Sequence, residues 1–170
     1  QDSIGALGWI NNQNISDTFA ANFTETILPK LFLLADGVGG HAHGAFASRK
    51  TIQIIVELFD RSAEDFNILN GILAAHAELV VKPQNLNCQM ATTIVGLVLC
   101  QNRALIFNVG DSRAYLISNK KINLLSIDDN DETKPKNIIT QCIGGVTKTP
   151  KPHFLSLKYE KKDTFILLSD

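Results

Sequence analysis

Three aspartates stand where segments typical of buried strands come to an end: Asp36, Asp111 and Asp170. The residues before them form short runs rich in Leu, Ile, Val and Phe, a composition typical of strands in a protein core. A carboxylate at the end of such a strand lies at the edge of a sheet, where it can reach a ligand. Mg²⁺ and Mn²⁺ prefer carboxylate and carbonyl oxygens. The three aspartates therefore predict one site for hard divalent cations.

The first of these aspartates is followed at once by a glycine-rich turn that also matches another pattern. Residues 37–42 satisfy the bare Gly-x-Gly-x-x-Ala fingerprint of dinucleotide-binding domains. The carboxylate of Asp36 would then repel the pyrophosphate beside it. The acidic residues about 20 positions further on, Glu57 and Asp60, end a helical pattern and follow no second strand. We favour a cation site, and a plain strand-to-helix turn with a solvated Asp36 stays open as the structural alternative.

The composition is that of one globular domain. The chain has 170 residues, of which 45% are hydrophobic and 19% charged, enough to bury a sizeable core. A net charge of −1 provides no field for nucleic acid or an anionic membrane surface, so we expect neither partner. No uncharged apolar stretch approaches the roughly 18 residues of a membrane span, and no secretory leader is visible. Three widely spaced cysteines favour free thiols and a cytoplasmic location.

A strand followed by two helices carries the first aspartate. Lys30–Ala35 is the strongest strand candidate in the chain. Across residues 44–61 the apolar side chains recur three or four positions apart, which predicts an amphipathic helix. Ser62 and Asp65 resemble a capping box, so we expect a second helix to begin there and to stop at Pro83.

Strand patterns dominate the remainder of the chain. The candidates are residues 6–11, 19–26, 91–100, 104–118, 121–127, 154–159 and 164–169. Asn102-Arg103 and Asn119-Lys120 are typical of tight connections, so neighbouring strands should be antiparallel. Residues 128–136 are highly polar and predict a surface loop. Strands, then a helix pair, then many further strands indicate the α+β class.

Four short segments carry a resemblance to a known family. Asp-Gly-Val-Gly-Gly, Ala-Thr-Thr, Gly-Asp-Ser-Arg-Ala-Tyr and Leu-Leu-Ser-Asp begin at residues 36, 91, 110 and 167. Their order resembles that of the metal-dependent serine/threonine phosphatases, the type-2C protein phosphatase family, across nearly the whole chain. Val38 stands where eukaryotic members carry a histidine, so the chain is more similar to the bacterial branch. The resemblance implies a four-layer αββα sandwich, with two antiparallel sheets face to face and helices outside.

The resemblance also implies a reaction. Members of this family hydrolyse phosphoserine and phosphothreonine on proteins with a water activated by two divalent cations, Mn²⁺ or Mg²⁺. By resemblance, Asp36 would bridge both cations and take part in catalysis, the Gly37 carbonyl would bind one of them, and Asp170 would bind the other. Asp111 resembles a ligand of a third, weaker ion, and the structural alternative, that it caps a turn near Arg113, stays open. The implied partner is a phosphorylated protein, and we expect a monomer.

The N-terminal segment departs from the family pattern. Family members carry an Arg followed a few residues later by Asn-Glu-Asp, and the corresponding stretch here is residues 12–17. Asn12 stands in place of the Arg that clamps the substrate phosphate, so a charge and a bidentate fork are lost. Ser16 replaces the Glu, which leaves Asp17 as a catalytic and metal-binding candidate. A catalytically impaired protein of the phosphatase fold, acting in binding or regulation, is therefore the alternative function.

A second departure lies at the C-terminal end. The chain stops at Asp170, directly after an apolar strand candidate, whereas the family continues to a final Asp-Asn motif whose Asp binds metal. Ending inside a buried strand would leave neighbouring strand edges unpaired. We therefore expect residues 1–170 to form a single phosphatase-like domain that lacks its C-terminal part.

Overall fold

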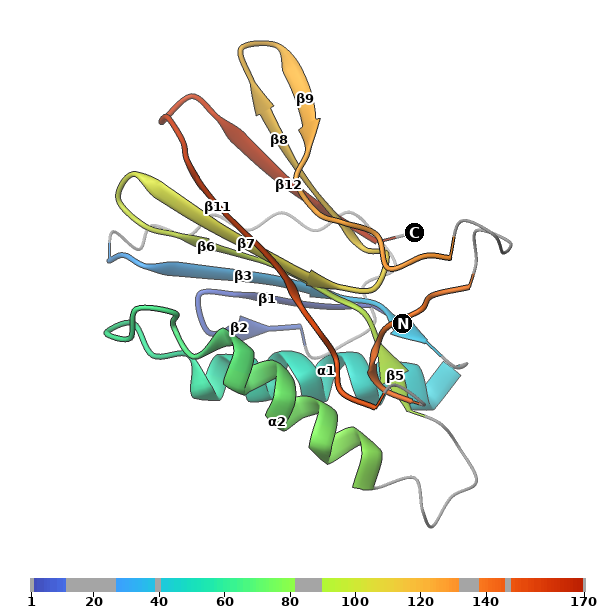
Figure 1. The fold of residues 1–170 in the computed structure, drawn as a ribbon. Coiled ribbons are helices and arrows are strands. Elements are labelled where there is room, and N and C mark those ends of the chain that lie inside the picture. The colour runs from blue at the N-terminus through green and yellow to red at the C-terminus, as the bar shows by residue number, and fades with distance from the viewer. Residues whose placement is uncertain are drawn as a thin grey trace.

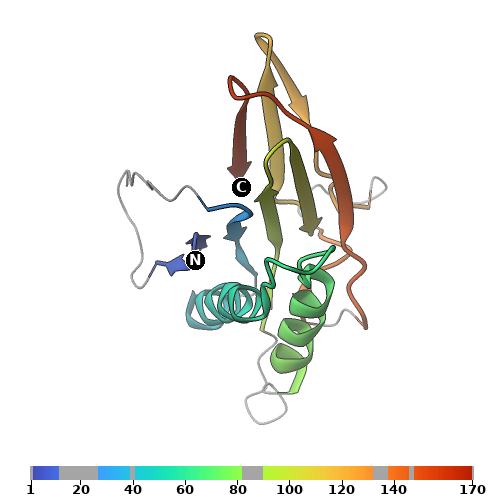
Figure 2. The same cartoon turned by 90° about the vertical axis from the view of Figure 1, so that its left-hand side faces the viewer.

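Two antiparallel sheets face each other in this computed structural model, and two helices cover the outer side of the larger sheet (Figure 1). The structure describes residues 2–11, 27–38, 41–81, 90–131, 138–145 and 148–169. Figure 2, turned by 90°, shows the helices at one end of this stack and the hairpin of the smaller sheet at the other.

The larger sheet has six strands, and every described pairing in it is antiparallel. Its spatial order is β11 (His153–Lys158), β7 (Arg103–Val109), β6 (Ile94–Leu99), β3 (Lys30–Ala35), β1 (Ser3–Ala6) and β2 (Trp9–Ile10). Successive side chains of a strand point to opposite faces. Leu33 therefore packs in the core on the helical side, whereas its neighbour Leu34 packs in the core on the other side. The central strands are buried on both faces.

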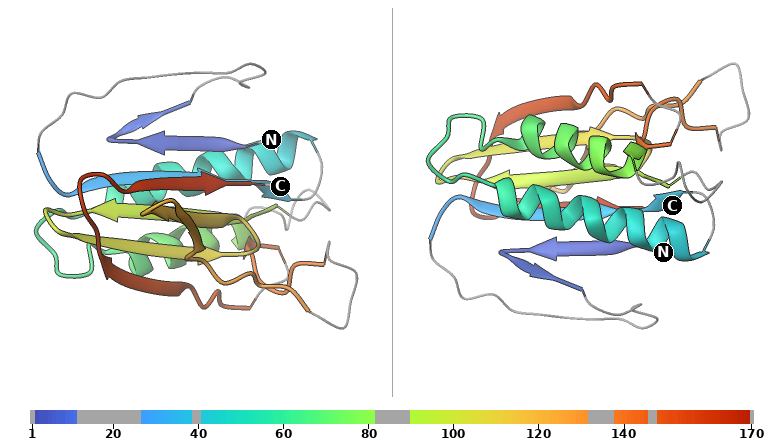
Figure 3. Two further views of the ribbon diagram at one scale, coloured as in Figure 1. Left: turned by 90° about the horizontal axis from the view of Figure 1, so that it is seen from above. Right: turned by 90° about the horizontal axis from the view of Figure 1, so that it is seen from below.

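Helices α1 (His41–Leu58) and α2 (Ile68–Val81) lie side by side on one face of this sheet, as the view from below shows (Figure 3). Their apolar faces contribute fully buried side chains to the core: Ile52, Ile55, Ile72 and Leu79. The predicted strand at Lys30–Ala35 and the predicted helix pair after it are confirmed. Of the described helices, neither combines the length and the apolar character needed to cross a membrane.

The second helix starts later than the pattern of Ser62 and Asp65 predicts. The Ser62 hydroxyl donates to Asp60 Oδ1 at 2.7 Å instead of capping a helix, and Asp65 Oδ1 accepts the N–H of Asn67 at 3.0 Å. Such local bonds between side chains and backbone stabilise turns in competition with helix. The capping-box prediction is therefore wrong, and α2 begins at Ile68.

The smaller sheet covers the opposite face of the larger one. Its order is β12 (Thr164–Leu168), β8 (Arg113–Ser118) and β9 (Lys121–Leu124). The buried side chains between the two sheets are Leu34, Val95, Leu97, Ala104, Ile106 and Ala114. The α+β class and the facing antiparallel sheets are confirmed. Within the described part of the chain, α1 and α2 form a helical layer on one side of the two facing sheets.

A third, short sheet extends the strands that carry the sequence motifs. Its order is β10 (Ile143–Gly144), β5 (Ala91–Thr92) and β4 (Gly37–Val38). β4 follows β3 directly after Asp36, and β5 lies just before β6. Segments that leave the larger sheet therefore pair again beyond it, which holds the first two motifs side by side.

The strand candidate at residues 6–11 is a hairpin rather than one strand. Leu7 and Gly8 turn between β1 and β2 with φ angles of +52° and +86°. The alternating pattern hides this turn because Leu7 is apolar, although the positive φ at Gly8 is the conformation that glycine favours. The other weak candidate, residues 19–26, lies outside the described residues.

Candidate functional site

Asp36 directly follows the last residue of β3, and two buried threonines fix its backbone by hydrogen bonds. The Thr92 hydroxyl donates to the Asp36 carbonyl at 2.7 Å, and the Thr93 N–H donates to the same oxygen at 2.9 Å. The Asp36 N–H in turn donates to Thr93 Oγ1 at 3.2 Å. Both polar backbone groups of Asp36 thus have partners. This fixes the point from which its side chain projects.

A second carboxylate, which the sequence patterns do not single out, lies beside Asp36. Strands β1 and β3 pair with Ser3 opposite Ala35, so Asp2 comes opposite Asp36. The two carboxyl groups share a hydrogen bond. Asp2 Oδ2 also accepts the hydroxyl of Ser169, the residue after β12, at 2.7 Å. The ends of three strands thus meet at one edge of the molecule, where Figure 3 shows both ends of the ribbon.

The surroundings of Asp36 raise its pKa from 3.8 to about 6. Burial is the largest cause, because it disfavours the charged form. The hydrogen bond and the negative charge of Asp2 follow, and the charge of Asp111 adds a smaller contribution. Carboxylates that repel one another at neutral pH are stabilised by a cation between them. The electrostatics therefore favour a cation here over an anion such as a pyrophosphate.

Gly37 allows the turn after Asp36 to pack tightly against α1. A Cβ on Gly37 would lie 2.2 Å from the carbonyl oxygen of Gly44, so no larger residue fits unless the helix moves. Gly37 also pairs with Thr92 between β4 and β5. The turn is therefore held between a helix and a strand. The Gly37 carbonyl oxygen remains a predicted metal ligand next to the carboxylates.

Asp111 approaches the carboxyl pair from the turn between β7 and β8. Gly110 in this turn has a φ of +99°, and a Cβ there would lie 2.6 Å from Thr93 Cγ2. The hydroxyls of Ser112 and Thr93 form a hydrogen bond of 2.7 Å. Thr93 thus connects the backbone of Asp36 to the turn that carries Asp111. Two of the three strand-ending aspartates are brought together in this way.

The chemical type of the possible metal ligands in this region suits a hard divalent cation. The described groups that act on Asp36 here are the carboxylates of Asp2 and Asp111, and carboxylate oxygens are ligands that such cations prefer. Among the residues that the structure describes, no three Asp, Glu, His or Cys side chains form a metal-binding group by themselves. The remaining candidates lie outside the described residues: Asn12, Ser16, Asp17 and Asp170. The hydrogen bond of Ser169 to Asp2 brings the chain to this edge one residue before Asp170.

Comparisons with known proteins agree with this arrangement. A family model described as protein phosphatase 2C matches residues 5–170. The chain is 27% identical over 166 residues to the serine/threonine phosphatase stp of Listeria monocytogenes, which covers 82% of this chain. It is 28% identical over 183 residues to the protein phosphatase PhpP of Streptococcus pneumoniae, which covers 94% of this chain and 72% of that protein. The structure of the S. agalactiae serine/threonine phosphatase matches with a TM-score of 0.70 at 25% identity, covering 98% of this chain and 78% of that one.

The matches cover different fractions of this chain and of its relatives. This chain spans 65% of the length of the Listeria relative. The matched residues of the family model nevertheless begin inside β1 and include all four motif segments. Because that match takes in nearly every residue, the chain belongs to the protein phosphatase 2C family.

Proposed function

We propose that this protein hydrolyses phosphoserine and phosphothreonine in proteins and depends on divalent cations to do so. The observation that carries the proposal is the contact between the carboxyl groups of Asp2 and Asp36, next to Asp111, with the pKa of Asp36 raised to about 6. Such a pair is unfavourable without a cation and well suited to binding one. The Listeria and S. agalactiae proteins named above are serine/threonine phosphatases, which supports the reaction class and a phosphorylated protein as substrate.

Oxygen atoms of this chain would hold Mn²⁺ or Mg²⁺. Asp36 is the proposed ligand shared by two cations, with Asp2 and the Gly37 carbonyl beside it. Asp111 is the proposed ligand of a third, weaker ion. Two bound cations would lower the pKa of a bound water and would neutralise the negative charge on the phosphoryl oxygens.

The other residues supply position. Thr92 and Thr93 fix the backbone of Asp36, so its carboxylate is presented in one geometry. Preorganised ligands of this kind lose little conformational entropy when they bind. Asp17 and Asp170 stay predicted metal ligands, and Asn12 stays a predicted phosphate contact.

Substitution of Asp36 in the full-length protein tests the proposal. The wild-type protein with Mn²⁺ should hydrolyse p-nitrophenyl phosphate and a phosphothreonine peptide. Asp36→Asn should lower the rate by roughly two orders of magnitude or more, because it removes the charge of a direct ligand. Asp128→Asn is the matched control, since Asp128 forms a surface ion pair with Arg113, and should keep its activity. Wild-type protein that binds Mn²⁺ but hydrolyses neither substrate would contradict the proposal and favour the impaired, regulatory alternative.

We also propose that the protein works as a monomer in the cytoplasm, without a nucleic-acid or membrane partner. The net charge of −1 and the free thiol of Cys100 support this. Light scattering after gel filtration should give the mass of one chain, and cell fractionation should find the protein with soluble components. The mass of a dimer, or recovery with membranes, would contradict this part of the proposal.

A further inference from the structure

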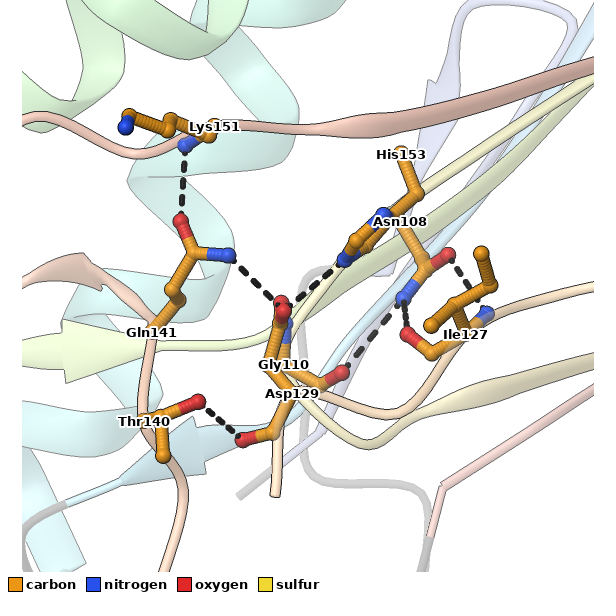
Figure 4. Close-up of polar contacts among 8 residues, drawn as sticks. All are labelled: Asn108, Gly110, Ile127, Asp129, Thr140, Gln141, Lys151 and His153. Carbon is orange, nitrogen blue, oxygen red and sulfur yellow. Dashed lines mark hydrogen bonds and ion pairs between the residues drawn. The ribbon is translucent and has the colours of Figure 1, made fainter. Parts of the chain in front are cut away.

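A buried carboxylate, Asp129, lies behind the turn that carries Asp111. Its side chain is only 6% exposed, although the polar composition of residues 128–136 predicts a surface loop. A charge removed from water is costly unless hydrogen-bond donors surround it. Figure 4 shows donors from three separate segments converging on this carboxylate.

Each carboxylate oxygen of Asp129 has a donor. The Gly110 N–H donates to Oδ2 at 2.8 Å. The Gln141 amide donates to Oδ1 at 2.8 Å, and His153 Nε2 lies 2.9 Å from the same oxygen. Because a carboxylate only accepts, His153 carries a proton on Nε2 in this contact. The Lys151 N–H donates to Gln141 Oε1 at 2.8 Å, which turns the amide nitrogen toward the carboxylate (Figure 4).

The turn at Gly110 is clamped from two sides. On one side, the Asp129 N–H donates to the Gly110 carbonyl at 3.0 Å, in addition to the bond that its carboxylate accepts. On the other side, Thr93 packs against the Gly110 Cα and bonds to the Ser112 hydroxyl. The residue between these fixed points is Asp111. Its position relative to Asp36 therefore depends on Asp129 as well as on Thr93.

We propose that Asp129 is a positioning residue of the cation site. It fixes the turn at Gly110 so that Asp111 stands close to Asp36, and His153 in turn fixes Asp129. The inference rests on the proposed function, because Asp111 serves the reaction only through a bound cation. Residues behind the direct ligands of a metal typically change its affinity by about 10–100-fold when they are replaced.

Asp129→Asn in the full-length protein provides the first test. An amide has one acceptor and one donor end, so either the Gly110 N–H or the donors on the other oxygen would face an N–H group. We expect calorimetry to show about tenfold weaker binding of the most weakly held Mn²⁺, and the Mn²⁺ midpoint of activity to shift equally. The kcat at saturating Mn²⁺ and the KM should be retained. Asp128→Asn changes the same charge one residue away, in an exposed ion pair with Arg113, and should leave the midpoint unchanged.

Two substitutions of His153 keep the test decisive if Asp129→Asn folds poorly. Glutamine keeps a side-chain N–H that can reach Asp129 Oδ1, whereas leucine has none. His153→Leu should weaken Mn²⁺ binding, and His153→Gln should bring the affinity back to within about twofold of wild type. Equal effects of the two substitutions would overturn the role of His153 as the support of Asp129.

Amide hydrogen exchange separates this inference from the proposed function. In metal-free protein, Asp129→Asn should speed exchange of the Gly110 amide by about tenfold or more, whether or not the protein hydrolyses phosphate esters. General destabilisation would instead speed exchange throughout the core. Unchanged Gly110 exchange, or an unchanged Mn²⁺ midpoint, overturns the positioning role and leaves the proposed function standing. Wild-type protein that binds no Mn²⁺ overturns both.

Discussion

The contact between Asp2 and Asp36 links ion binding to the stability of the fold. The two carboxyl groups meet because β1 pairs with β3, and they repel each other at neutral pH. The metal-free protein thus carries an unfavourable interaction that a bound cation removes. A ligand that binds only the folded state stabilises that state by mass action. At the scale of residues, the paired carboxyl groups lower the stability of the metal-free fold and raise the affinity for a cation. Such a loss of stability is common at functional sites.

The raised pKa of Asp36 predicts how the stability of the metal-free protein varies with pH. Folding raises this pKa from 3.8 to about 6, so stability falls as the pH rises through that window. Because Asp36 is only half-buried, we discount the effect for solvent screening to about 1 kcal/mol, or roughly 2–4 °C in melting temperature. Asp36→Asn should melt above wild type by that amount at pH 7, and the difference should vanish at pH 4.

Melting curves recorded with a chelator across this pH range measure the difference between the two proteins. Added Mn²⁺ should raise the melting temperature of the wild-type protein at pH 7 and have much less effect on Asp36→Asn. A difference between the proteins that does not change with pH would mean that Asp36 has no raised pKa in the folded state.

Thr93 offers a test of how the Asp36 backbone is held. Thr93→Val keeps the shape but removes the hydroxyl that bonds to the Asp36 N–H and to Ser112. We expect a loss of about 1–3 kcal/mol in the free energy of unfolding measured with urea, because buried groups lose their partner. Thr51→Val is the matched control, since the buried Thr51 hydroxyl has no hydrogen-bond partner among the described residues, and it should be neutral or stabilising. Equal losses in both variants would contradict the bracing role of Thr93.

The sequence identifies Asp36 but not its neighbour, for a physical reason. Asp36 ends a strong strand and precedes a glycine-rich turn, which are local signals. Asp2 gains its importance from the register that places Ser3 opposite Ala35, a pairing between distant segments. A single acidic residue at position 2, without a strong strand pattern or a glycine-rich turn beside it, carries no such local signal.

At the scale of elements, α2 anchors the short sheet that holds the first two motifs. The Gly144 N–H, in β10, donates to His76 Nδ1 at 3.0 Å. His76 Nε2 lies 3.1 Å from the Lys148 carbonyl, so the ring is a neutral tautomer with its proton on Nε2. Since β10 pairs with β5 and β5 with β4, this histidine supports the strand next to Asp36.

His76→Phe tests this anchor. An aromatic ring stays in place, although it is larger than imidazole, but the Gly144 N–H and the Lys148 carbonyl lose their partner. We expect the free energy of unfolding to fall by about 2–4 kcal/mol, because each buried group left unsatisfied costs roughly 1–3 kcal/mol. Leu69→Ala on the exposed side of α2 should change it by less than about 1 kcal/mol. Chemical unfolding curves of similar midpoint for His76→Phe and Leu69→Ala would rule out the anchor.

Regular elements follow from the sequence where periodicity is strong, as at Lys30–Ala35 and α1. The errors fall where local side chains compete with the pattern, as Ser62 does by bonding to Asp60. Asp129 shows a further limit. It stands in a polar segment, yet donors from Gly110, Gln141 and His153 make its burial possible. Those donors come from distant segments, so local composition cannot reveal them.

The molecule as a whole is organised around one shared sheet. Leu33 faces the helical core and Leu34 the core between the sheets, so both cores are built on the same strands. An open, mostly apolar pocket of about 550 Å³ lies beside the core between the sheets, lined by residues that include Phe32, Leu97 and Phe165. Because both cores share the strands of one sheet, we propose that the chain forms a single domain.

A single domain predicts one unfolding transition. Removal of either core would expose the same strands, so the two cores should be lost together. Urea unfolding followed by far-UV circular dichroism and by the fluorescence of Trp9 should therefore give coincident curves. Two separated transitions would show that the smaller sheet folds independently of the helices and the larger sheet.

Calorimetric titration of the metal-free, full-length protein with Mn²⁺ tests the central claim most directly. The account predicts binding to the wild-type protein, binding that is at least about tenfold weaker in both Asp2→Asn and Asp36→Asn, and unchanged binding in Asp128→Asn. Equal Mn²⁺ affinity in wild type and Asp36→Asn would contradict the claim that the paired carboxyl groups form the cation site.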